Sequence, residues 1–160
     1  MNTTQNPTTI SAQPGTPFID VVREFDATPA QVFRAQTDPE LVVQWLGPRD
    51  LTMRLEQWDV RSGGSYRYIH SRGTDEFAFH GIFHTVTPNE LVIQTFEFEG
   101  VPGQVALDTA KYEDLGGRTR LRTRSVFPSV EARDAAVETG MTGGILDSMD
   151  RLAELLAGSK

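Results

Sequence analysis

Residues 65–83 read SYRYIHSRGTDEFAFHGIF, two runs of alternating side chains on either side of the turn signal Gly73-Thr74. Alternation of this kind is typical of β-strands, and a two-residue loop joins antiparallel strands as a hairpin. A loop at Gly73-Thr74 fixes the register and gathers the aromatic side chains on one face. The predicted pairs on that face are Tyr66 with Gly81, Tyr68 with Phe79 and His70 with Phe77, and Phe83 shares the face.

The same alternation extends outward from the hairpin over residues 51–127, interrupted by turn signals rich in Gly, Pro and Asn. Six strands fit between these turns, and the short connections require antiparallel pairing. Upstream, residues 18–25 are predicted to form a further strand. Two short helices follow it and begin at Pro29 and Pro39, since proline is favoured in the first turn of a helix.

In the C-terminal part of the chain, apolar residues recur with the spacing of an α-helix. One apolar stripe combines Met141, Ile145, Met149, Leu152 and Leu156. The order of strand, two short helices, six strands and long helix predicts an α+β fold, with an antiparallel sheet of about seven strands around the long helix. Residues 1–17 contain almost no large apolar side chain and are predicted to form a flexible tail, so a single domain spans residues 18–158.

Composition excludes several classes of function. Fifteen Lys and Arg against 22 Asp and Glu give a net charge of −7, which disfavours nucleic acid as a partner. The absence of Cys excludes thiolate chemistry, and the chain has no phosphate loop or dinucleotide-binding glycine motif, so no cofactor is expected. No apolar run reaches the ~20 residues that cross a bilayer, and no signal peptide is visible. We therefore expect a cytoplasmic protein without a membrane partner.

A set of motifs along the chain resembles a known family. The motifs are REFDATPAQVFRAQTDPELVVQWLGP at 23–48, a turn with Asp59, Arg61, Gly63 and Gly64, GIF at 81–83, TPNELV at 87–92 and GGRTRL at 116–121. Together they resemble the activator-of-heat-shock-protein-90-ATPase-like branch of the START-like superfamily, also called SRPBCC or polyketide cyclase/dehydrase. The resemblance implies a helix-grip fold, in which a curved sheet wraps around the C-terminal helix and leaves a cavity for small apolar molecules. Gly140-Met141 departs from the Gly-Trp of many relatives, so the shape of their pockets does not transfer.

The aromatic face and the helix stripe supply the candidate ligand-binding residues. A mostly apolar surface with a few polar tips is typical of small-molecule pockets, although a filled aromatic core has the same composition. Trp45 fits either the core or a lid over the pocket, and Met53 and Trp58 fall on opposite faces of one strand, so only one of them can face inward. The candidate cavity residues are Phe33, Trp45, Tyr66, Tyr68, His70, Phe77, Phe79, Phe83, Phe96, Met141, Ile145, Met149 and Leu152.

Among the histidines, only His70 is placed for acid-base chemistry, because a neutral imidazole can relay a proton near neutral pH. A hydrogen-bonded wall residue is the alternative for His70. His80 and His84 point away from that face, and four residues along a strand separate them by about 13 Å, too far to share one metal ion. No metal site is therefore predicted.

Four arginines at 118, 120, 122 and 124 alternate along one predicted strand and share one face. Such a row could bind a carboxylate-bearing ligand or an acidic partner, since each guanidinium can hold a carboxylate with two hydrogen bonds. The alternative is a solvated outer face paired with acidic neighbours, for which Glu97 and Glu99 are candidates.

Three functions are compatible with these features. The first is binding of a small, mostly apolar ligand, aromatic or lipid-like, between the sheet and the C-terminal helix. The second is an enzyme resembling polyketide cyclases and aromatases, in which His70 with Tyr66 or Tyr68 moves protons. The third is a co-chaperone module that acts on the heat-shock-protein-90 ATPase, with the chaperone as partner. The open edges of the predicted sheet permit a monomer or a homodimer.

Overall fold

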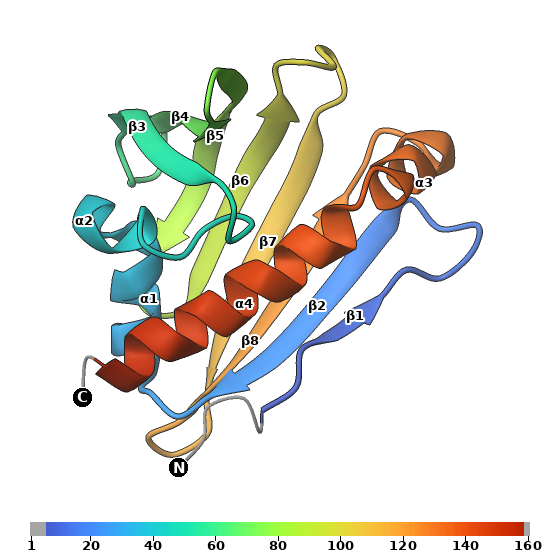
Figure 1. Ribbon diagram of the computed structural model, residues 1–160. Coiled ribbons are helices and arrows are strands. Elements are labelled where there is room, and N and C mark those ends of the chain that lie inside the picture. The colour runs from blue at the N-terminus through green and yellow to red at the C-terminus, as the bar shows by residue number, and fades with distance from the viewer. Residues whose placement is uncertain (1–5, 159–160) are drawn as a thin grey trace.

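The computed structural model describes residues 6–158, and its central element is one antiparallel sheet of eight strands. The strand order is β1-β2-β8-β7-β6-β5-β4-β3, and helix α4 crosses one face of the curved sheet (Figure 1). This arrangement confirms the predicted helix-grip fold. None of the described helices is long and apolar enough to span a membrane. The elements are β1 (Thr9–Ser11), β2 (Phe18–Phe25), α1 (Pro29–Thr37), α2 (Pro39–Val42), β3 (Thr52–Trp58), β4 (Ser65–Arg72), β5 (Asp75–Thr87), β6 (Leu91–Phe98), β7 (Ala106–Asp114), β8 (Thr119–Val126), α3 (Val130–Glu138) and α4 (Met141–Gly158).

Two N-terminal caps start the short helices directly after β2. The backbone amide of Gln31 donates to the Thr28 hydroxyl at 3.2 Å, and the backbone amide of Thr28 donates to Gln31 Oε1 at 2.8 Å. This capping box starts α1, with Pro29 in the first turn. The Asp38 carboxylate accepts from the backbone amide of Glu40 at 2.9 Å and starts α2. Both predicted helix starts are confirmed.

The β4–β5 hairpin has the register that the sequence predicts. Tyr66 pairs with Gly81, Tyr68 with Phe79 and His70 with Phe77, and Gly73-Thr74 form the loop between the strands. Because every second side chain of a strand points to the same side, these side chains lie on a single face of the sheet. The aromatic side chains of the hairpin are therefore brought together by strand pairing.

A β-bulge in β3 overturns the prediction that Met53 and Trp58 lie on opposite faces. The register between β3 and β4 shifts between Leu55 and Gln57, so the strand carries one extra residue there. Met53, Leu55 and Trp58 are all partly buried and all pack against the core. The indole of Trp58 donates to the carbonyl of Thr37 at 2.8 Å, which anchors the end of α1 on β3.

The segment predicted as a flexible tail contributes the eighth strand. Thr9–Ser11 form β1 and pair antiparallel with β2, with Ile10 opposite Val21. Without β1, β2 would be the edge of the sheet and its backbone groups on that side would have no strand to pair with. Three residues with little apolar side chain are enough here because the backbone, not burial, supplies the pairing. Residues 1–5 of the predicted tail lie outside the described residues.

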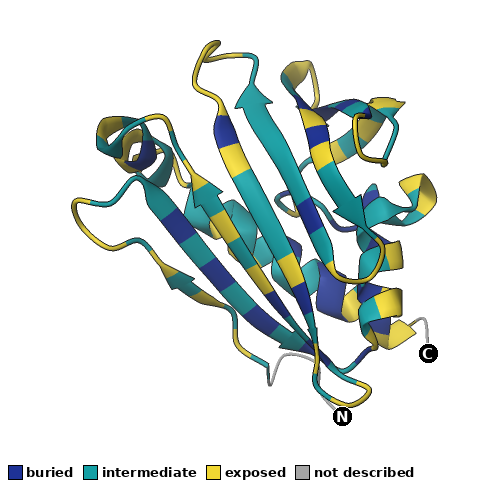
Figure 2. Ribbon diagram, turned by 180° about the vertical axis from the view of Figure 1, so that it is seen from behind, coloured by how far each residue is buried: buried dark blue, intermediate teal, exposed yellow. Residues whose placement is uncertain are grey.

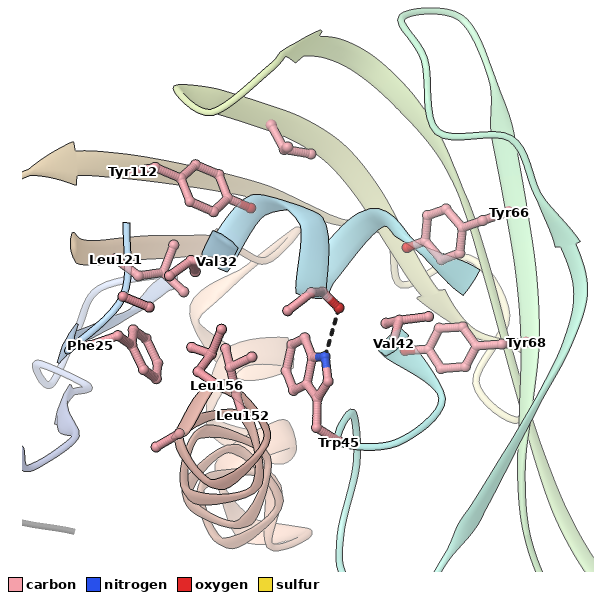
Figure 3. Packing of buried hydrophobic residues seen from close by; sticks show 14 of the residues in the cluster. Phe25, Val32, Val42, Trp45, Tyr66, Tyr68, Tyr112, Leu121, Leu152 and Leu156 are labelled. Atoms are coloured by element: carbon pink, nitrogen blue, oxygen red, sulfur yellow. Dashed lines mark hydrogen bonds between the residues drawn. The ribbon is translucent and has the colours of Figure 1, made fainter. Parts of the chain in front are cut away.

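The packed core lies at the end of the sheet that α1, α2 and the C-terminal half of α4 cover (Figure 3). Phe25 and Leu121 from the strands meet Leu152 from α4, and each of the three is at most 2% exposed. Trp45 is equally buried, and its indole donates to the Ala35 carbonyl at 2.9 Å. Trp45 is thus a core residue that fixes α1 to the segment after α2.

A buried charge ties α4 to the sheet at a second place. Arg23 on β2 points toward α4 and is 2% exposed, and its guanidinium donates to Asp150 of α4 at 2.6 Å. The same nitrogen donates to the Thr8 hydroxyl at 3.0 Å. A buried guanidinium is costly to leave without a carboxylate, so the Arg23–Asp150 pair fixes where α4 crosses the sheet.

Removing the Asp150 carboxylate tests this restraint. In Asp150→Ala we expect the free energy of unfolding, measured by urea denaturation, to fall by about 2 kcal/mol. This value is below the roughly 3–5 kcal/mol of a fully buried pair, because the Asp150 side chain is 47% exposed. Glu138→Ala, at an exposed position at the end of α3, serves as the control and should change stability by less than about 0.5 kcal/mol. Equal losses in the two variants would contradict the role of the pair.

Candidate functional site

The face of the sheet that α4 crosses, called the inner face here, is only partly covered. Along β2, buried residues alternate with partly exposed ones, as Figure 2 shows from the opposite side. In the middle of the inner face, small or polar side chains occupy three adjacent strands, β6, β7 and β8, and the register places Gln94, Asp108 and Ser125 side by side. We call this group the floor; it consists of Gln94, Asp108, Ala110, Thr123 and Ser125.

Every floor residue keeps part of its surface exposed. In a fully packed helix-on-sheet interface, small residues at the centre of the sheet would be buried, as Ala106 is at 3% exposure. Side chains as short as Ala110, Thr123 and Ser125 do not extend far from the sheet. Neither α4 nor the neighbouring side chains close over the floor, so solvent reaches the middle of the inner face.

A run of near-parallel rings borders the floor on the side of β4 and β5. Tyr66 stacks on Tyr68 with ring centroids 6.0 Å apart, Tyr68 on Phe79 at 5.2 Å, and Phe79 on Phe96 at 5.3 Å. We call these four residues the ring stack. Tyr66 and Tyr68 are buried, whereas Phe79 and Phe96 are partly exposed. The ring stack therefore runs from the closed part of the interior to the accessible part.

The predicted site residues divide into three groups. Phe33, Trp45 and Leu152 lie at the packed end, where Phe33 meets the Tyr112 ring edge-on at 5.6 Å. The hairpin and β6 supply the aromatic wall: Tyr66, Tyr68, His70, Phe77, Phe79, Phe83 and Phe96. On α4, Met141, Ile145 and Met149 are partly buried. Sequence reasoning missed Phe98, whose ring centroid lies 5.1 Å from that of Phe79. Phe98 follows Phe96 by two residues in the same strand, and this spacing could have placed it on the same face.

His70 is held by a backbone contact. Its Nε2 lies 3.2 Å from the carbonyl oxygen of Leu46, and its ring packs against Tyr68 at 5.1 Å. Burial lowers the pKa of the imidazole, which favours the neutral ring with its Nε2 proton donated to Leu46. Gly47 has a φ of +107°, and a Cβ there would lie 2.6 Å from His70 Nε2. His70 thus packs directly on the loop that follows α2.

The two tyrosine hydroxyls of the ring stack differ in their partners. Tyr66 donates to the carbonyl of Thr95 at 2.6 Å. The Tyr68 hydroxyl has no hydrogen bond to any of the described residues. Burial raises the pKa of both groups well above the ordinary tyrosine value, so both stay protonated at neutral pH. Tyr68 therefore offers a donor that the protein itself does not use.

Asp108 is the functional candidate that sequence reasoning missed. It lies at the centre of the floor between Gln94 and Ser125, and its Oδ1 is shielded from solvent without a hydrogen-bond partner. Burial raises the pKa of the carboxyl from 3.8 to about 6, and the Ser125 hydroxyl partly offsets this increase. In sequence, one Asp in the alternating run ALDTAKYED gives no signal, because either face of that strand could be solvated.

The outer face carries paired charges. Arg118 and Arg120 bind Glu24, Arg122 binds Glu113, and Arg124 binds Asp20. The arginine row therefore follows the alternative of a paired outer face. The predicted partners Glu97 and Glu99 are wrong, because β8 lies between β2 and β7 whereas these two residues lie on and just beyond β6 and bind His80 instead. Among residues 6–158 no group of His, Asp and Glu could hold a metal ion.

The Asp108 pKa predicts a stability change with a defined pH dependence. Its folded pKa of about 6 exceeds the ordinary 3.8, so the stability linked to this group is full below about 3.8 and is lost as the pH rises through 6. We expect Asp108→Asn to be more stable than the native chain by about 3 kcal/mol at pH 8, at 1.36 kcal/mol per pKa unit, and by little at pH 4. Urea denaturation at both pH values measures this. A difference that is the same at pH 4 and pH 8 would contradict the raised pKa.

The overall structure is shared with proteins from several bacteria. A protein from Arthrobacter aurescens superimposes with a TM-score of 0.87 at 24% identity, over 94% of this chain and 91% of its own. A protein from Rhodobacter sphaeroides gives 0.86 at 24% identity, over 95% and 99% of the two chains. CalU16 from Micromonospora echinospora gives 0.62 at 17% identity, over 94% and 85%. At these identities the likeness concerns the fold alone.

No curated protein sequence matches the chain significantly. The model of the family described as Activator of Hsp90 ATPase homolog 1-like protein matches residues 26–157, from α1 through all but the last residue of α4. The match covers the capped helices, the aromatic hairpin, the floor and α4. The chain therefore belongs to the Activator of Hsp90 ATPase homolog 1-like family, within the SRPBCC superfamily.

Proposed function

We propose that this protein binds a small, largely apolar molecule between the inner face of the sheet and α4. The observation that carries the proposal is the floor, whose short side chains stay partly exposed beneath the helix. The partly exposed rings of Phe79 and Phe96 border it, and Met149 and Ile145 lie on the helix that crosses it. Apolar walls with a few polar groups are typical of small-molecule sites.

The arrangement favours binding over proton transfer by His70. The Nε2 of His70 is engaged with the Leu46 carbonyl, and the hydroxyl of Tyr66 is engaged with the Thr95 carbonyl. His70 and Tyr66 thus serve as structural contacts in the closed part of the interior, and of the three groups that a cyclase-type reaction would use only the Tyr68 hydroxyl has no hydrogen bond to the described residues. A co-chaperone function stays a prediction from the family resemblance, and it would depend on the surface rather than on the inner face.

Filling the floor tests the proposal directly. Ala110→Phe places a ring at the centre of the floor, and we expect it to weaken binding of the neutral fluorescent probe N-phenyl-1-naphthylamine at least tenfold. Since the space is open, the variant should keep its melting temperature; in a space already filled, overpacking would cost roughly 1–3 kcal/mol. Fluorescence titration and thermal denaturation measure the two effects.

Thr109→Phe is the matched control, because Thr109 is the adjacent residue of β7 and points to the outer face. It should leave probe binding within about twofold of the native protein, since it changes only the far side of the same strand. Failure of the native protein to bind the probe, together with a destabilised Ala110→Phe, would overturn the proposed function.

A further inference from the structure

Among the described residues, Arg23 and Asp108 are charged side chains on the part of the inner face that α4 crosses, and only Arg23 has a partner of opposite charge. Arg23 is paired with Asp150 of α4. Asp108 forms no ion pair with any of the described residues, and its cross-strand neighbours Gln94 and Ser125 are both uncharged. A desolvated carboxylate without a counter-charge is unfavourable, so a ligand that supplies the positive charge is strongly preferred there.

The surroundings of Asp108 suit a cation attached to an apolar body. Phe96 lies two residues from Gln94 on β6, one rung along the inner face from Asp108, and its ring is the accessible end of the ring stack. Aromatic ring faces attract ammonium groups and also pack against apolar groups. On the other side of Gln94, the register places Phe83 of β5 opposite Gln94, so Asp108 lies two strands from the aromatic wall of the hairpin.

Asp108 keeps part of its surface exposed, although its Oδ1 is shielded. Rotation about the last torsion of an aspartate exchanges its two oxygens with little cost, so either oxygen can receive a donor from the accessible side. The remaining floor groups are neutral hydroxyls and one amide, which can hydrogen-bond an ammonium group but cannot neutralise it. Asp108 is the one floor residue that can do so.

We propose that the site is selective for a small apolar molecule that carries a protonated amine, with the amine bound by Asp108 and the apolar body against the ring stack. This inference rests on the proposed function and adds the chemical class of the ligand. Hydrogen bonds between ammonium and carboxylate are about twice as strong as neutral ones, and more so away from water. The net charge of −7 further favours a cation over an anion in the approach to the protein.

A matched set of three probes tests the proposal: 2-naphthylmethylamine, its neutral counterpart 2-naphthylmethanol and the anion 2-naphthoate. Isothermal titration at pH 7.5 should show the amine binding at least tenfold more tightly than the alcohol, and the anion more weakly than either. In Asp108→Asn, the affinity for the amine should fall at least tenfold, while the affinity for the alcohol changes less than threefold. The Asn side chain keeps the shape and removes the charge.

Asp75→Asn controls for net charge, because it removes one negative charge at an exposed position at the start of β5. It should leave the preference for the amine unchanged. Equal binding of amine and alcohol by the native protein, or an equal loss of amine affinity in Asp108→Asn and Asp75→Asn, would overturn the inference.

The neutral probe N-phenyl-1-naphthylamine separates this failure from failure of the proposed function. If the native protein binds that probe and shows no preference for the amine, the apolar site stands and the amine selectivity is wrong. If none of the four probes binds, both are wrong. A melting curve of Asp108→Asn tests whether the variant is folded. We expect it to be folded, because the substitution removes a carboxylate whose burial destabilises the native protein.

Discussion

The position of α4 over the sheet is the constraint on which the rest of this structure depends. At its C-terminal half the helix is fixed by the packed core around Leu152, and the Ser148 hydroxyl accepts from the Gly47 amide at 2.8 Å. Arg151 adds hydrogen bonds to the carbonyls of Gln44 and Gly47. With Arg23 holding Asp150, these restraints lie between Ser148 and Leu152, in the middle of the helix. Among the described residues, 141–146 of α4 make no side-chain hydrogen bond or ion pair to the sheet, so this part of the helix is held less firmly over the floor.

An accessible interior and a buried carboxyl both reduce stability, and the fold compensates for them elsewhere. Apolar surface that stays in contact with water contributes nothing to folding, and Asp108 at neutral pH opposes it. The fully buried residues Phe25, Val32 and Leu121 concentrate the favourable burial at the opposite end of the sheet. Division of one interior into a dense end and an open end is typical of proteins in which binding, rather than packing alone, shaped the core.

Side-chain alternation and turn residues in the sequence predict most of the strands, the helices and their order. These signals fail where the structure of a strand depends on the strand that pairs with it. The Tyr68–Phe79 pairing follows from period two and a two-residue loop, both of which are visible in the chain. The bulge that turns Met53 and Trp58 to the same face leaves no such mark, and β1 forms only because β2 offers it an edge. Asp108 was missed for the same reason: its face, its neighbours and its lack of a counter-charge depend on β6 and β8, which the residues around it do not specify.

The contrast between the two faces of the sheet explains why a single carboxyl matters in a chain with 22 acidic residues. On the outer face, arginines and acids alternate across β2, β8 and β7 in half-exposed pairs, each of which contributes little because water screens it. On the inner face, the Oδ1 of Asp108 is shielded from water, and a charge there interacts more strongly with a group that approaches it. The acidic composition therefore says little about the site. Its chemistry depends on which acid the sheet turns inward, and on the floor that acid is Asp108.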